Sequence, residues 1–89
     1  MPTRTSKKVP DGKLVRLDLD ADDRIRSVTI TGDFFVEPPA ARRELEAAIE
    51  GHPVDVNRER LLNDLEAVEA TLLGFSRSDL VDLTLEALS

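Results

Sequence analysis

The side chains that could do acid–base or nucleophilic chemistry are sparse in this chain. His52 is its one histidine, it stands between Gly51 and Pro53, and cysteine is absent. A hydrolytic triad needs a nucleophile with a base within reach, whereas a histidine between glycine and proline is typical of a loop. The acidic residues fall mostly on expected helix surfaces or in a turn, which does not suit the paired carboxylates of a glycosidase. We therefore expect no catalytic residue.

Motifs for phosphates and metals are also missing. The chain has no Walker loop, no G-x-G-x-x-G fingerprint and no cysteine and histidine spacing for zinc. Four aspartates, Asp18, Asp20, Asp22 and Asp23, loosely suggest a cation loop. A calcium loop of the EF-hand type also requires a glycine and a closing glutamate, which this stretch lacks. We interpret the aspartates as a solvated strand face and turn, and expect no metal site.

Charge is divided unevenly along the 89 residues. Residues 1–16 carry a net charge of +4, the remaining residues carry −10, and the whole chain carries −6. An acidic body disfavours nucleic-acid binding, which depends on neutralising many phosphates. No apolar run approaches the roughly 20 residues that span a bilayer. These features, with the absence of cysteine, predict a cytoplasmic protein that binds neither nucleic acid nor membrane. The basic segment either meets an anionic ligand or is simply solvated.

Hydrophobic periodicity predicts an antiparallel β-hairpin near the start. Apolar residues alternate with charged ones over residues 14–20, a polar turn follows at 21–24, and residues 25–31 are rich in β-branched types. Ile25 is out of phase with Val28 and Ile30, which indicates a bulge near Arg26 and Ser27. One version of this prediction adds a short third strand at 34–36. Residues 1–8 are polar, and we expect them to form a flexible basic N-terminal segment.

The remainder is predicted to be helical. One helix follows Pro38 and Pro39 and ends before Gly51, and a second runs from an Asn57 N-cap to Gly74. A third begins at Ser76 with a capping box to Asp79, and Phe75 can staple onto Leu80. The predicted fold class is therefore α+β, a hairpin packed against about three helices, in a single domain over residues 9–89. A domain this small has a marginal core, which makes a partner subunit a reasonable expectation.

Phe34 and Phe35 are two of the three aromatic residues and stand side by side. In an extended chain neighbouring side chains point to opposite faces, so one ring would need cover from a helix or a partner. Alternatively, Gly32 and the two prolines bend the chain so that both rings enter the domain's own core. We slightly favour the second arrangement. Asp33 likewise is either a turn residue or a functional carboxylate.

Two motifs together resemble the C-terminal, or accessory, domain of lipoate–protein ligases. The first is Lys-Val-Pro-Asp-Gly-Lys-Leu-Val at 8–15, and the second is Ile-Thr-Gly-Asp-Phe-Phe at 30–35. The later Leu-Gly-Phe-Ser at 73–76, opening a final helix, is similar too. The resemblance covers nearly the whole chain beyond residue 6. In that family the domain is fused to the catalytic domain or, in some archaea, encoded separately, and a chain of this length looks like the separate form.

The resemblance implies a role in assisting another subunit. The ligase makes lipoyl-AMP from lipoate and ATP, then transfers the lipoyl group to a lysine of an acceptor protein. In the separate form the accessory protein forms a heterodimer with the catalytic subunit and is needed for adenylation. Lipoate, ATP and Mg²⁺ are thus implied for the complex and not for this chain alone. Octanoate is an alternative substrate. A structural or interaction module with a partner unrelated to lipoate is the alternative function.

The family motifs also suggest site residues. Lys8 and Lys13 lie in the basic lead-in and are candidates for facing the nucleotide phosphates. Gly32, Asp33, Phe34 and Phe35 match the strand-end motif and are candidates for covering the pocket or forming the interface. Asp11 departs from the glycine expected in the first motif, and an acid between the lysines weakens the phosphate role. Solvated lysines without a ligand are an equal alternative.

Overall fold

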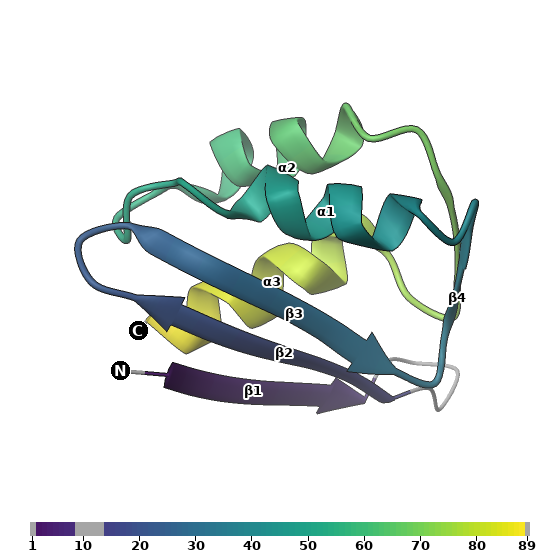
Figure 1. The fold of residues 1–89 in the computed structure, drawn as a ribbon, viewed down its shortest axis with the longest axis horizontal. Helices are drawn as coiled ribbons and strands as arrows, with labels where there is room; N and C mark the ends of the chain where they lie inside the picture. The colour runs from purple at the N-terminus through teal and green to yellow at the C-terminus, as the bar shows by residue number, and fades with distance from the viewer. Residues whose placement is uncertain (1, 9–13, 89) are drawn as a thin grey trace.

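The described part of the chain forms a three-stranded antiparallel sheet, a two-stranded sheet and three helices (Figure 1). The structure is a computed structural model that describes residues 2–8 and 14–88. Its elements are β1 (Pro2–Lys8), β2 (Leu14–Ala21), β3 (Ile25–Gly32), β4 (Phe35–Glu37), α1 (Ala41–Ile49), α2 (Arg58–Glu66), β5 (Thr71–Leu73) and α3 (Arg77–Leu88). The predicted α+β class is confirmed.

The hairpin of β2 and β3 follows the alternation of the sequence. Val15, Leu17 and Leu19 are buried on the core side of β2, and they lie opposite residues of β3 in an antiparallel register. The register shifts between Asp20 and Ala21, so that Arg26 is the extra residue of a bulge. The bulge brings Ile25 back into the core, where 1% of its surface is exposed. The predicted irregularity is therefore present.

The first strand differs from the sequence-based expectation. Residues 1–8 were expected to be flexible, but Pro2–Lys8 form β1, which pairs antiparallel with β2 from Pro2 opposite Asp20 to Lys8 opposite Leu14. This strand lacks the hydrophobic alternation by which strands are recognised. Main-chain hydrogen bonding to a neighbouring strand depends on the backbone, so a polar segment can pair without that pattern.

The helix α3 packs against the sheet at β1 and β2, behind the strands in Figure 1. Its start has the predicted capping box, because the Ser76 hydroxyl accepts from Asp79 N–H at 3.1 Å and Asp79 accepts from Ser76 N–H at 2.9 Å. Phe75 and Leu80 are both buried next to this start. The reciprocal hydrogen bonds satisfy two backbone donors that the first turn would otherwise leave without partners.

The helix α1 lies beside the outer edge of β3. Carboxylate side chains at the C-terminal end of α1 accept hydrogen bonds from backbone N–H groups of β3. Glu46 accepts from Ile30 N–H at 2.7 Å, and Glu50 accepts from Val28 N–H at 3.0 Å. Arg43 spans both carboxylates, at 3.3 Å from Glu46 and 2.7 Å from Glu50. The Arg43 guanidinium and the Val28 N–H both lower the pKa of Glu50, although partial burial opposes them. Glu46 is 6% exposed, so its carboxylate is buried. It accepts the hydrogen bond that a carbonyl group of a neighbouring strand would otherwise accept.

The loop after α1 continues this edge with backbone groups. Gly51 N–H donates to the Ile25 carbonyl at 2.8 Å, and Ile25 N–H donates to the His52 carbonyl at 2.9 Å. Gly51 has φ of +89°, a conformation that glycine adopts without the penalty of a side chain. The expected glycine stop of α1 is thus confirmed, and the same turn extends the cover along β3.

The second helix is shorter than predicted. We expected it to reach Gly74, whereas α2 ends at Glu66 and is followed by β5. Arg77 donates to the carbonyls of Leu65, Val68 and Ala70 at 2.9, 2.6 and 3.2 Å. These bonds take up carbonyl groups at and beyond the helix end, where the last turn leaves acceptors free. The predicted N-cap is confirmed, since Asn57 accepts from Arg60 N–H at 2.8 Å.

Replacing Glu46 should test the pairing of α1 with β3. We expect Glu46→Ala to lower the free energy of unfolding by about 1–3 kcal/mol, because the Ile30 N–H would lose its acceptor in a buried place. Glu44→Ala is the matched control, since Glu44 lies on the exposed side of the same helix. Urea denaturation of the two variants measures both values. Equal, small losses would contradict a specific role for Glu46.

Candidate functional site

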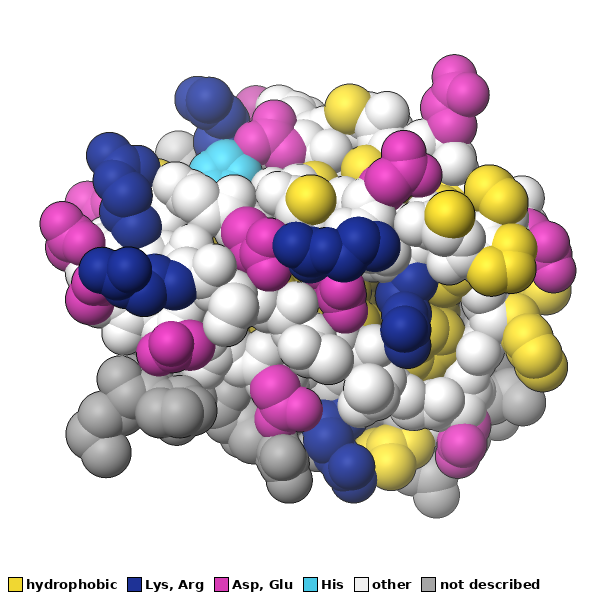
Figure 2. All heavy atoms as spheres, in the orientation of Figure 1, with side chains coloured by type: hydrophobic (Ala, Val, Ile, Leu, Met, Phe, Trp, Pro, Cys, Tyr) yellow, Lys and Arg dark blue, Asp and Glu magenta, His cyan; other side chains and the backbone are white. Residues whose placement is uncertain are grey.

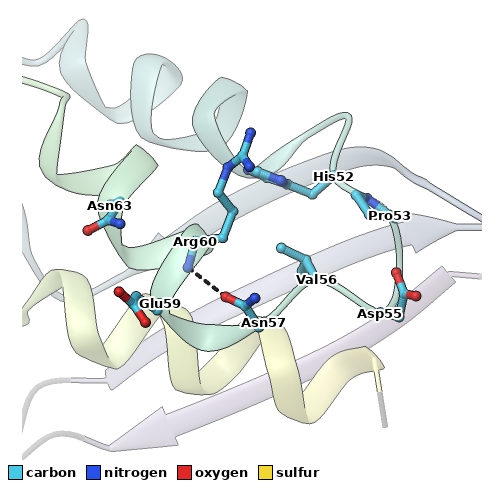
Figure 3. A pocket seen from close by; sticks show the side chains of 8 residues that line it. All are labelled: His52, Pro53, Asp55, Val56, Asn57, Glu59, Arg60 and Asn63. Atoms are coloured by element: carbon cyan, nitrogen blue, oxygen red, sulfur yellow. Dashed lines mark hydrogen bonds between the residues drawn. The ribbon is translucent and has the colours of Figure 1, made fainter.

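His52 lies in the loop between α1 and α2, with its imidazole next to a carboxylate of α2. Its Nε2 lies 2.7 Å from the Asp64 carboxylate of α2, and its side chain is 13% exposed. It lines an open hollow of about 510 Å³ with seven other residues (Figure 3): Pro53, Asp55, Val56, Asn57, Glu59, Arg60 and Asn63. None of these carries a hydroxyl or thiol group that a histidine could activate. The pair with Asp64 instead fastens the loop to α2.

The aspartates of the hairpin turn are engaged in local hydrogen bonds. Asp22 accepts from Arg24 N–H at 3.1 Å and from the Arg26 side chain at 2.7 Å. These two interactions hold the pKa of Asp22 well below its usual range. Within residues 2–8 and 14–88, no group of three acidic or histidine side chains is arranged to hold a metal ion. Asp22 is therefore held in the turn by Arg24 and Arg26.

Gly32 redirects the chain at the end of β3. Its φ is +146°, and a Cβ built on it would lie 2.1 Å from the Leu14 carbonyl oxygen. The next residue, Asp33, donates its N–H to that same oxygen at 2.8 Å, and its side chain is exposed. A side chain at position 32 would thus collide with the main chain of β2. The glycine lets the chain leave the sheet and form β4 elsewhere.

The two neighbouring phenylalanines separate at this point. Phe34 packs on Phe75, with ring centroids 4.5 Å apart and planes inclined by 47°. Phe35 is 66% exposed. Our preferred expectation, that both rings enter the core, is therefore wrong. Beyond the Gly32 turn the chain is extended, so successive side chains alternate and the second ring faces outward.

Leu73 is exposed next to Phe35. The sequence analysis did not identify Leu73 as a surface residue. The expected short strand is present as β4, but it pairs with β5 instead of extending the hairpin. In that pairing Phe35 lies directly opposite Leu73, which is 51% exposed. We call these two side chains the Phe35–Leu73 surface. The signal available was the pair of leucines at 72 and 73 before Gly74, which was included in the second helix.

A second hollow borders this surface. It measures about 430 Å³ and is lined by Thr31, Gly32, Phe34, Phe35, Val36, Glu37, Pro39 and Arg42. Arg42 reaches the carbonyl of Ile30 at 3.5 Å from one side of it. Figure 2 shows hydrophobic side chains gathered at the end of the molecule where β4 lies in Figure 1. The structure thus brings three of the candidate residues, Gly32, Phe34 and Phe35, around one hollow.

The candidate lysines are described only in part. Lys8 is the last residue of β1 and lies opposite Leu14, whose carbonyl meets the Gly32–Asp33 turn. The backbone of Lys8 is therefore at the same end of the sheet as that turn. Lys13 lies outside the described residues. In the described part of the chain, no helix has the length and apolar character needed to cross a membrane.

Comparison with known proteins found a similar solved structure. No family model matches the chain, and no curated protein sequence matches it. Among solved structures, it is similar to a chain from an archaeal lipoylation system, a bipartite lipoate protein ligase and its E2 lipoyl domain from Thermoplasma acidophilum. The two chains are 25% identical, 94% of each is covered, and the TM-score is 0.78. The resemblance to a lipoate–protein ligase accessory-type domain, indicated by the sequence motifs, is confirmed.

Gly32 and Gly51 offer a matched pair of substitutions. Gly32→Ala should destabilise the fold by more than about 2 kcal/mol, because the new methyl group meets backbone and φ stays positive. Gly51→Ala should cost only about 1 kcal/mol, since no atom lies within 4 Å of its Cβ position. Thermal and urea unfolding give both values. A Gly32→Ala protein as stable as Gly51→Ala would contradict the close approach to Leu14.

Proposed function

We propose that this protein is the accessory subunit of a bipartite lipoate–protein ligase. In this proposal it forms a heterodimer with a separate catalytic subunit in the cytoplasm. The pair, and neither protein alone, converts lipoate and ATP to lipoyl-AMP, from which the lipoyl group passes to an acceptor lysine. Lipoate, ATP and Mg²⁺ are assigned to the complex, as the family resemblance implies, and this chain contributes no catalytic residue.

The observation that carries the proposal is the mutual coverage with the Thermoplasma chain. Because 94% of each chain is covered, the matched component is about as short as this protein. The match therefore extends over almost the whole of both chains and is not confined to a short shared segment. A hydrophobic pair exposed at one end, Phe35 with Leu73, is also what a subunit that functions in a complex would present.

Adenylation measured with and without this protein tests the proposal. Lipoyl-AMP formation is followed with the catalytic subunit alone, with this protein alone and with both. We expect product at an appreciable rate only when both are present, because the adenylating site is completed by the complex. A protein that neither binds the catalytic subunit nor changes its rate would support the alternative, a structural or interaction module with a partner unrelated to lipoate. A full rate from the catalytic subunit alone would also contradict the proposal.

The two lysines of the basic lead-in are proposed to face the nucleotide phosphates in the complex. The Lys8→Ala and Lys13→Ala double variant should then slow adenylation by about ten-fold or more, because positive charge near developing phosphate charge stabilises the transition state. Arg60→Ala is the control, since Arg60 is an exposed cation of α2. Circular dichroism and melting curves show whether both proteins remain folded. An unchanged rate in the double variant would assign the lysines to solvent.

A further inference from the structure

The Phe35–Leu73 surface is the most exposed apolar feature of the described residues. Among the described residues three large hydrophobic side chains are exposed, namely Phe35 at 66%, Leu73 at 51% and Val54 at 37%. Val54 lies in the loop between α1 and α2, whereas Phe35 and Leu73 are cross-strand neighbours. Single exposed hydrophobic residues are ordinary, but adjacent ones indicate a contact surface. Aromatic side chains, moreover, are enriched among residues that dominate binding energy.

The strands β4 and β5, which carry this surface, pack against the core through their inward-facing side chains. Val36 and Leu72 alternate with the exposed pair and point inward, where Val36 is 9% exposed and Leu72 packs on the core. Phe34 holds the start of β4 by its contact with Phe75, with centroids 4.5 Å apart. The exposed pair is therefore held in place before any partner arrives. Such preorganisation reduces the entropy lost on binding.

Charge around the surface points to the chemistry of the partner. Glu37 follows Phe35 by two residues in β4, so it lies on the same outer face, and it is exposed. Asp33, two residues before Phe35, is exposed as well. Carboxylates therefore flank Phe35 along the chain, and Figure 2 shows acidic side chains beside the hydrophobic ones at this end. A complementary surface carries lysine or arginine around an apolar centre.

The bordering hollow provides room for a side chain of that partner. Its walls include Phe34, Phe35, Val36 and Pro39, so much of the lining is apolar, and Arg42 and Glu37 add polar groups. Binding anchors typically fill such a pocket next to an exposed aromatic residue. The hollow and the Phe35–Leu73 surface thus form one continuous contact area.

We propose that this area is the docking site for the catalytic subunit, which inserts an apolar side chain framed by lysine or arginine residues. This inference rests on the proposed function and adds to it the surface, the residue Leu73 and the chemistry of the contact. Phe35 and Leu73 supply the apolar contact, Glu37 supplies the charge on the same face, and Gly32 sets the direction of β4.

Affinity measurements with the purified catalytic subunit test the docking site. Phe35→Ser and Leu73→Ser should each weaken the complex, with Phe35→Ser raising Kd by about 30-fold or more, as expected for a central aromatic contact. Val54→Ser is the matched control, because it removes an exposed hydrophobic side chain from the loop between α1 and α2, and its Kd should stay within about two-fold of wild type. Circular dichroism and urea unfolding verify that all three fold.

A charge variant gives a second, independent readout. Glu37→Lys should slow association, and the difference from wild type should shrink as salt is raised, because exposed charges are screened. Phe35→Ser and Glu37→Lys proteins that bind like wild type would overturn the docking site while leaving the subunit role intact. Self-association of this chain that Phe35→Ser abolishes would also overturn it, in favour of a second copy. If the wild-type protein does not bind the catalytic subunit, the proposed function itself fails.

Discussion

The pairing of α1 side chains with the edge of β3 constrains the rest of the structure. Strand edges carry main-chain groups that need partners, and here Glu46 and Glu50 accept from Ile30 and Val28 while the Gly51–His52 backbone bonds to Ile25. Each contact occurs only if α1 lies at one position along β3. A buried carboxylate such as Glu46 is costly unless it is paired, so this position is strongly preferred. The contacts also close the edge to further strands.

The exposed end of the molecule follows from this constraint. With α1 fixed beside β3, the chain between them must leave the sheet and return within a few residues, and Gly32 permits the turn where any side chain would meet the Leu14 carbonyl. The intervening β4 cannot extend the sheet at an edge that α1 occupies, and it pairs with β5 instead. That arrangement buries Val36 in the core and packs the partly buried Phe34 on Phe75. It leaves Phe35 and Leu73 outside, where the proposed contact is made.

Local sequence signals predicted the helix caps and the bulge, which depend on residues close in the sequence. They did not predict the strands whose pairing depends on segments distant in the sequence. Three such features could be predicted because their interacting residues lie within a few positions of one another. They are the Ser76 capping box, the Asn57 N-cap and the bulge at Arg26. The strand β1 was missed because a polar segment can pair with a strand without alternating apolar and polar residues. The strand β5 was missed because Leu72 continues the helical spacing of the apolar residues of α2. Family motifs suggested Gly32, Phe34 and Phe35 as candidates, and the structure places these three residues around one hollow. The motifs did not identify Leu73, which becomes a neighbour of Phe35 only through the pairing of β4 with β5.

We propose that one end of this small acidic protein contacts the catalytic subunit and that the other end stabilises the fold. Amide chemical shifts of the isotope-labelled protein, recorded with and without the catalytic ligase subunit, test this division most directly. We predict that shifts concentrate in residues 31–37 and 71–75, and that the loop at 51–57, which includes His52, is unaffected. Shifts centred on that loop, with the β4–β5 end unchanged, would contradict the account.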